Sequence, residues 1–221
     1  MKKTLKWKIA QQAEWRWWKR YLKGKDPSSY LHWKRNYWNT LWGPVTPLLS
    51  LPAGSRLADV GCGPAGLFMV TGKYATTAID PLLGQYEQLG SFFRRADYPH
   101  VTFISMPFES FETIEPFDVI CCLNALNHFS DLPVSLDKLT RFLKPGGFLL
   151  LSVDAHNHSF FKHLFRLIPG DILHPHQYSL EEYLGMMEKR NFLCIRQECL
   201  KKEYFFNHEL LLFQLAGNTG N

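Results

Sequence analysis

Residues 57–66 read LADVGCGPAG, in which a short apolar run passes directly into a glycine-rich turn. The apolar run predicts a buried β-strand. Glycine in the turn lets a ligand approach the backbone more closely than a Cβ atom would allow. This stretch therefore predicts a ligand site at the end of a strand, in an α/β fold.

Two acidic residues indicate which ligand suits this turn. Gly61, Gly63 and Gly66 match the G-x-G-x-x-G pattern of dinucleotide sites, which is a weak signal by itself. However, the Asp59 carboxylate beside the turn would repel a pyrophosphate, whereas it suits an ammonium or sulfonium group. Asp80 follows the next apolar run, where an acidic side chain accepts hydrogen bonds from both ribose hydroxyls. A nucleoside with a cationic tail satisfies both acids.

Around the turn, short apolar runs alternate with helical patterns, which predicts a parallel sheet covered on both faces. The last two β-like runs are joined by too short a connection for a crossover helix, so we expect them to pair antiparallel. The expected strands are 56–61, 75–80, 101–106, 117–123, 147–153, 192–200 and 207–216, and the expected helices lie near 64–72, 82–95, 132–143 and 179–190.

Four ordered segments resemble the class I S-adenosylmethionine-dependent methyltransferases, namely residues 59–66, 78–80, 117–120 and 139–147. The resemblance implies a doubly wound, Rossmann-like α/β fold with a seven-stranded, mostly parallel sheet whose last strand is antiparallel. It also implies S-adenosyl-L-methionine as the cofactor. Within the family, residues 117–128 resemble the O-methyltransferases of ubiquinone biosynthesis, although Asn124 and Asn127 stand where those enzymes have glutamates.

The resemblance also implies which residues contact the cofactor. Phe108 would pack on the adenine ring, with core packing as the equal alternative. Because neutral amides are poor ligands for hard cations, we predict no metal site. The expected cofactor contacts are Asp59, Gly61, Cys62, Gly63, Asp80, Pro81, Phe108, Glu109, Leu123 and Asn124.

Methyl transfer to a hydroxyl group requires a base, and histidines are the candidates. His128 follows the fourth expected strand, and His174 and His176 precede the helix expected from Ser179. The alternative for His128 is helix capping or packing. For the other two it is a solvent-facing position before a Ser179 N-cap.

Residues 1–42 differ in composition from the rest of the chain. They contain all seven tryptophans and carry a net charge of +9, whereas the remainder carries −4. The pattern predicts a helical hairpin of residues 5–23 and 28–42, with Ala10, Ala13, Trp17, Trp18 and Tyr21 on one stripe facing protein. We therefore expect an N-terminal extension, residues 1–45, on a methyltransferase domain, residues 46–221.

Three roles compete for this hairpin. It could be a lid that closes over cofactor and substrate, a membrane-surface helix pair, or a nucleic-acid contact. A tryptophan stripe that includes small alanines is typical of a face packed on protein, which favours the lid. Residues 124–127 do not match the Asn/Asp-Pro-Pro-aromatic motif of enzymes that methylate nucleic-acid amino groups, which argues against a nucleic-acid substrate.

The interpretation is a small-molecule methyltransferase, O-directed, acting on an apolar or aromatic acceptor. The odd number of cysteines, which lack metal-ligand spacing, suggests reduced thiols in a cytoplasmic protein. No run predicts a signal peptide or a membrane span. Two alternatives stay open: a non-catalytic S-adenosylmethionine-binding protein that docks a partner or membrane through its hairpin, and an NAD-dependent oxidoreductase.

Overall fold

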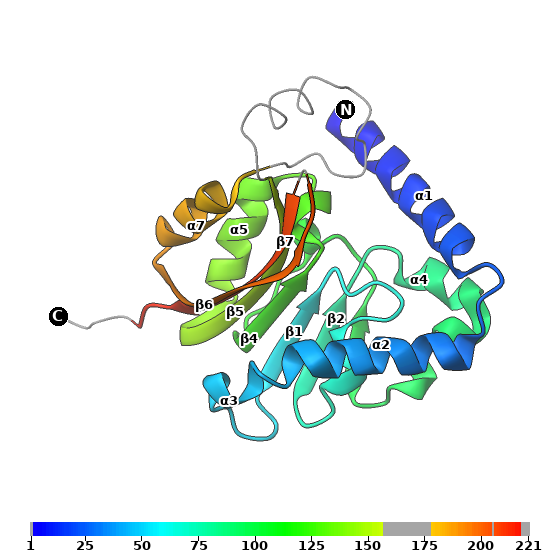
Figure 1. Ribbon diagram of the computed structural model, residues 1–221, viewed down its shortest axis with the longest axis horizontal. Coiled ribbons are helices and arrows are strands. Elements are labelled where there is room, and N and C mark those ends of the chain that lie inside the picture. Colours follow the sequence, from blue (N-terminus) through cyan, green and yellow to red (C-terminus); the bar gives the residue numbers. More distant parts are fainter. Residues whose placement is uncertain (1, 157–177, 205, 218–221) are drawn as a thin grey trace. The chain divides into compact units, whose positions relative to one another are not determined.

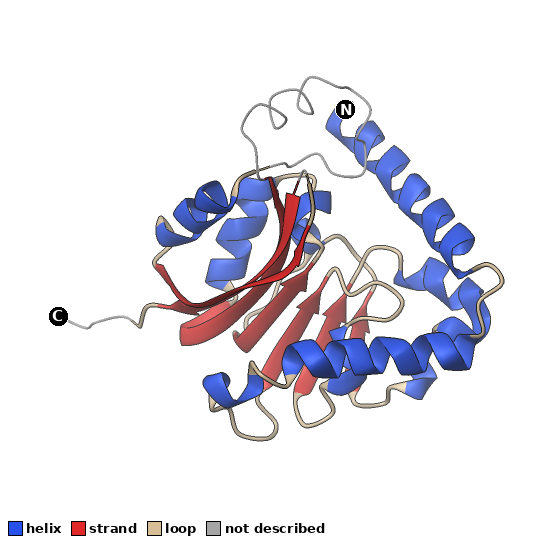
Figure 2. Ribbon diagram, viewed as in Figure 1, coloured by secondary structure: helices blue, strands red, loops and turns tan. Residues whose placement is uncertain are grey.

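The computed structural model describes residues 2–156, 178–204 and 206–217. Its seven strands form one mixed sheet in the order β3-β2-β1-β4-β5-β7-β6. The last strand in the chain, β7, runs antiparallel to both of its neighbours. Figure 2 shows the strands together with their connecting helices. The arrangement confirms the predicted doubly wound fold with an antiparallel last strand. The chain divides into two compact units, residues 1–111 and 112–221.

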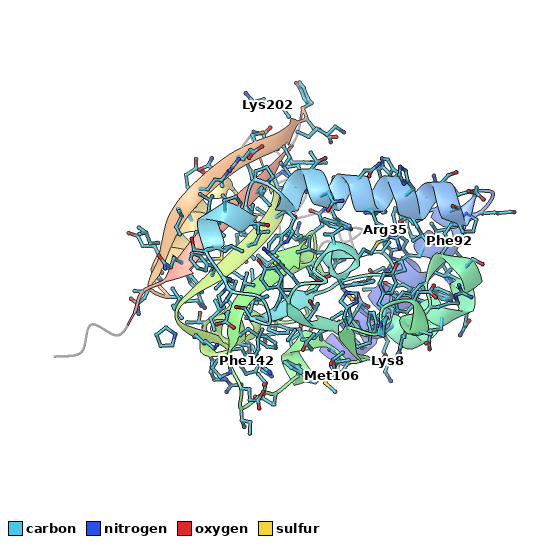
Figure 3. All side chains as sticks on the ribbon, turned by 90° about the horizontal axis from the view of Figure 1, so that it is seen from below. Lys8, Arg35, Phe92, Met106, Phe142 and Lys202 are labelled. Atoms are coloured by element: carbon cyan, nitrogen blue, oxygen red, sulfur yellow. The ribbon has the colours of Figure 1, made fainter. Side chains whose placement is uncertain are left out.

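The first unit begins with the predicted helical hairpin. Helices α1 (Lys2–Leu22) and α2 (Pro27–Trp42) are joined by a short turn (Figure 1), and the short α3 (Thr46–Leu49) follows. Asp26 caps α2, because its carboxylate accepts a hydrogen bond from the Ser29 amide at 2.7 Å and Pro27 occupies the first turn. Phe92, labelled in Figure 3, packs its ring on Tyr30 of α2 with centroids 5.7 Å apart.

The buried face of α1 differs from the predicted stripe. Gln11, Trp15 and Leu22 are buried, whereas Trp17 is 46% exposed. Trp18 of the predicted stripe does face protein, since its ring contacts Tyr86, but the prediction was wrong for Trp17. It rested on the positions of small and aromatic residues, but a partner surface elsewhere in the chain selects the face that is buried.

The strands of this unit are β1 (Arg56–Val60), β2 (Ala75–Ile79) and β3 (Val101–Ile104), paired in parallel. The helices expected at 64–72 and 82–95 are much shorter than predicted. Gly90 interrupts the second of them with a φ of 61°. Between the strands lie the 3₁₀ helices η1 (Leu67–Val70), η2 (Glu87–Phe92) and η3 (Arg95–Asp97), the short α4 (Leu83–Tyr86) and, after β3, η4 (Phe108–Ser110).

The second unit contains β4 (Phe117–Leu123), η5 (Leu126–His128), α5 (Leu132–Arg141), β5 (Leu143–His156), α7 (Leu180–Glu188), β6 (Phe192–Lys202) and β7 (Phe206–Leu215). Strand β5 is longer than predicted, because the Lys-Pro-Gly-Gly stretch 144–147 extends it towards α5. Ser179 caps α7 in a capping box with Glu182, as expected of that serine.

Among the helices in the described part of the chain, none combines the length and the apolar content that crossing a bilayer requires.

Candidate functional site

The glycine turn leaves the carboxyl end of β1 and is the centre of the candidate site. Gly61 and Gly63 have φ angles of +68° and +59°, which only glycine adopts without strain. The Gly61 amide donates to the carbonyl of Ile79, 2.8 Å away, and thereby fastens the turn to the end of β2. Cys62 between them is buried, and burial raises the pKa of its thiol, with Asp80 and Asp59 adding to the shift.

Asp59 binds the turn itself. Its side chain accepts a hydrogen bond from the Phe68 amide at 2.9 Å and a second from the Leu67 amide. Burial raises the pKa of Asp59 to about 7, although both amide bonds oppose that shift. In a dinucleotide fold, backbone amides at this position bind the pyrophosphate. Here the amides of Leu67 and Phe68 are directed at a carboxylate, which disfavours an anionic ligand.

Gly66 is required by the packing of the turn on itself. A Cβ atom at this position would contact the Cys62 carbonyl oxygen and would lie 2.7 Å from Oδ2 of Asp59. Gly66 was predicted to let a ligand approach the backbone. In the structure, its lack of a side chain lets the Asp59 carboxylate reach the backbone amide of Phe68.

We expect Gly66→Ala to destabilise the folded chain by about 2–3 kcal/mol, because the new methyl group meets backbone that cannot move freely. Urea unfolding followed by circular dichroism measures the effect. Gly185→Ala is the matched control: nothing lies within 4 Å of a Cβ atom there. Its position in α7 should make it neutral or stabilising by about 0.5–1 kcal/mol. Equal stability of the Gly66 variant and wild type would contradict this account of the turn.

Asp80 lies immediately after β2 and faces the turn. Its Oδ2 accepts from the Gly63 amide at 2.9 Å and its Oδ1 from the Leu82 amide at 2.8 Å. Burial raises the pKa of this carboxyl, while the two amides stabilise its ionised form. Each carboxylate oxygen retains a further lone pair, so Asp80 fits the predicted role of accepting the ribose hydroxyls.

Helix α1 packs on the same turn. An aromatic carbon of Trp18 lies 3.5 Å from where a Cβ atom of Gly63 would stand. The rings of Trp15 and Trp18 contact the ring of Tyr86 on α4, with centroid distances of 6.3 and 6.1 Å. From α2, Trp38 donates its indole N–H to the Ala65 carbonyl at 2.8 Å. Both helices of the hairpin thus contact the glycine turn within the first unit.

The remaining predicted contacts of the first unit lie near the strand ends. Pro81 follows Asp80 and is partly exposed, and Glu109 lies in η4, also partly exposed. Phe108 is 3% exposed and stacks on Phe111 with centroids 6.5 Å apart. This burial agrees with the core-packing alternative for Phe108.

In the second unit, Leu123 and Asn124 end strand β4. Asn124 has a φ of 55°, and its amide donates to the Ser152 hydroxyl at 2.9 Å, which fastens the end of β4 to β5. His128 lies in η5, partly exposed. His174 and His176 lie outside the described residues, so their predicted roles stay predictions.

Two polar pairs in the second unit were missed by sequence reasoning. The Tyr183 hydroxyl of α7 donates to Asn127 at 2.7 Å, beside His128 in the chain. Nδ1 of His208 lies 2.7 Å from Asp154, which it faces across strands β5 and β7. A carboxylate bonded to one imidazole nitrogen orients the ring and selects its tautomer, leaving the other nitrogen to act as a base. Sequence reasoning had no signal for the second pair, because the predicted antiparallel pairing joined residues 192–200 and 207–216.

The residues of the first unit fit the methyl donor that the sequence predicts. The turn is closed by glycines, its amides are directed at Asp59, and Asp80 presents a carboxylate that suits a ribose. Cationic sulfonium and ammonium groups are favoured beside these buried acids.

Comparison with known proteins agrees with this fit. A family model described as a methyltransferase domain matches residues 30–197. The chain is 29% identical over 118 residues to a tRNA U34 carboxymethyltransferase of Alteromonas mediterranea, covering 50% of this chain and 36% of that protein. It is 26% identical over 100 residues to a ubiquinone biosynthesis O-methyltransferase of Rickettsia typhi, covering 44% and 40%.

These matches span less than half the length of either curated relative. Among solved structures, a magnesium protoporphyrin IX methyltransferase from Synechocystis PCC 6803 with bound SAH has a TM-score of 0.68 at 16% identity, with 98% of this chain and 100% of that chain covered. At this identity the likeness shows the shared fold.

Proposed function

Because this chain belongs to the methyltransferase-domain family, which uses S-adenosylmethionine, we propose that it transfers the donor's methyl group to an oxygen atom of a small apolar or aromatic acceptor. The observation that carries the proposal is the arrangement of the glycine turn. Its amides at Leu67 and Phe68 are occupied by Asp59, and Asp80 faces Gly63 with a carboxylate. This arrangement favours a cationic nucleoside over a pyrophosphate.

Methyl transfer from a sulfonium is an in-line displacement, so the protein has to align an acceptor and, for a hydroxyl, remove its proton. His128 is the proposed base. The Asp154–His208 pair supports His208 as a second candidate, because Asp154 binds one ring nitrogen and thereby orients the imidazole. No divalent cation enters the proposal.

The aromatic residues of the hairpin support an apolar acceptor and a lid role for residues 1–45. Trp15, Trp18 and Trp38 all contact the region of the glycine turn or Tyr86. A lid that excludes water would strengthen the electrostatic interactions at the donor. The five cysteines are free thiols, which supports the proposed cytoplasmic location.

The experiment is a turnover assay that follows S-adenosylhomocysteine on a panel of acceptors. The panel contains phenols and hydroquinones, the corresponding anilines, and an unmodified tRNA pool. We expect product with the hydroxyl compounds and methyl incorporation at oxygen by mass spectrometry. Product with the anilines alone would move the reaction to nitrogen. Donor binding without turnover on any acceptor would instead favour the non-catalytic alternative.

A further inference from the structure

The face of α1 that packs on the glycine turn carries one acidic residue, Glu14, which is the only acid among residues 1–25. It lies on the partly buried side of the helix, next to Trp15 and one turn before Trp18, and the rings of both tryptophans contact the ring of Tyr86. Glu14 was not among the predicted site residues, because nothing in the local sequence brings it near Asp80, 66 positions later in the chain.

Asp80 lies close enough to Glu14 to act on its ionisation. Burial raises the pKa of Glu14 above its ordinary value, the charge of Asp80 raises it further, and the neighbouring Trp18 and Tyr86 partly offset the shift. The other ionisable groups around this point are Asp59, Cys62 and Tyr86. The one positive group here among the described residues is Arg95, whose charge acts to lower the pKa of the Cys62 thiol. Negative groups therefore outnumber positive ones here.

Tyr86 is the polar side chain that faces Glu14 from α4. Its side chain is completely buried, and the charges of Asp80 and Glu14 both raise the pKa of its hydroxyl. Although the Glu14 carboxyl is close enough to act on that pKa, no polar atom of the described residues meets the Tyr86 hydroxyl in good hydrogen-bonding geometry. The buried side-chain oxygen of Gln11, one turn before Glu14 on α1, is also unpartnered among the described residues. Tyr30 and Tyr74 also have buried hydroxyls without a partner among the described residues, so Tyr86 is distinguished by its place between α1 and Asp80.

We propose that Glu14, together with Tyr86 and the ring of Trp18, forms a wall of the methyl-donor site and that the Glu14 carboxyl recognises the positive charge of S-adenosylmethionine. A cation beside two neighbouring carboxyl groups relieves their repulsion, and the faces of Trp15, Trp18 and Tyr86 attract a cation as well. The inference rests on the donor part of the proposed function and is independent of the acceptor.

Calorimetric titration of the full chain with S-adenosylmethionine and with S-adenosylhomocysteine tests the proposal. We expect Glu14→Gln to weaken binding of S-adenosylmethionine by about tenfold, as expected for loss of a charge-assisted contact. A loss of affinity for S-adenosylmethionine alone would show that Glu14 recognises the sulfonium. An equal loss of affinity for both ligands would show that it recognises the ammonium group, which they share. Tyr86→Phe should also weaken binding. Glu188→Gln and Tyr74→Phe are the matched controls, since Glu188 is exposed and Tyr74 is another buried tyrosine with an unpartnered hydroxyl.

Thermal unfolding distinguishes this role from a structural one. A raised pKa means that the folded state disfavours the Glu14 carboxylate, so stability is lost as pH rises from the unfolded pKa through the folded one. The neutral amide in Glu14→Gln removes that penalty. We therefore expect a higher Tm than wild type at pH 7.5 in the absence of ligand, together with weaker binding. A residue with a purely structural role would lower the Tm.

Proton release provides the last readout. A bound cation lowers the pKa of Glu14, so wild type should release protons at pH 7, measured as different binding enthalpies in phosphate and Tris buffers. Glu14→Gln should release fewer. Unchanged affinity, tighter binding or unchanged proton release in Glu14→Gln would overturn the proposal, the last by assigning the titration to Asp59 or Asp80. If wild type binds neither ligand, the donor assignment itself fails.

Discussion

Asp80→Ala is expected to weaken binding of S-adenosylmethionine and S-adenosylhomocysteine by about 100-fold, the loss of two hydrogen bonds to a charged acceptor. The Asp80 carboxylate is held by the Gly63 and Leu82 amides, 2.9 and 2.8 Å away, at the carboxyl end of β2. In that position a ribose can donate both hydroxyls to it. Isothermal titration calorimetry measures the effect, and both ligands should lose affinity equally because they share the ribose.

The same substitution removes the acceptor for two backbone amides, so stability has to be measured beside affinity. Asp80→Asn keeps one acceptor oxygen and should lose less affinity than Asp80→Ala. Asp97→Ala is the control, because Asp97 pairs with Arg94 on the surface of the same unit and is 40% exposed. Binding within twofold of wild type by a folded Asp80→Ala protein would show that the ribose is bound elsewhere.

His128→Ala is expected to lower kcat by about 100-fold, within the range for loss of a general base, while the Kd for S-adenosylmethionine changes little. The histidine lies in η5, directly after the end of β4, where ligands of α/β sheets bind. Steady-state kinetics with a hydroxyl acceptor provide kcat, and calorimetry provides the Kd.

Added imidazole should partly restore turnover of His128→Ala, an effect that a packing defect would not show. His100→Ala, which changes an exposed histidine of the first unit, should retain wild-type turnover. Full activity of His128→Ala combined with loss of activity in His208→Ala would transfer the role of base to the Asp154–His208 pair.

Much of the fold followed from local patterns. The strands expected at 56–61, 75–80, 117–123 and 192–200 appear within two residues of those bounds. For 117–123, a continuous apolar run of this length has few alternatives to a buried strand. The positions of Asp59 and Asp80 at two strand ends were predictable for the same reason.

The helices beside the glycine turn were less predictable. Residues 64–72 have a helical pattern, but only the 3₁₀ turn Leu67–Val70 forms. The Phe68 amide lies in its first turn, where a helix supplies no acceptor, and it donates to the Asp59 carboxylate instead. For α1, the buried face is selected by contacts with Tyr86 and the glycine turn rather than by its own composition.

The sequence by itself determined the order of strands and helices, the glycine turn after the first strand, and the two acids that suit a cationic nucleoside. These features depend on neighbours within a few residues. Only the tertiary structure decided that Asp80 and Tyr86 lie close enough to Glu14 to act on its ionisation, and that His208 meets Asp154, 54 residues earlier. The physical reason is that a carboxyl's pKa and a histidine's orientation depend on burial and on charges nearby in space, which the chain brings together only when it folds.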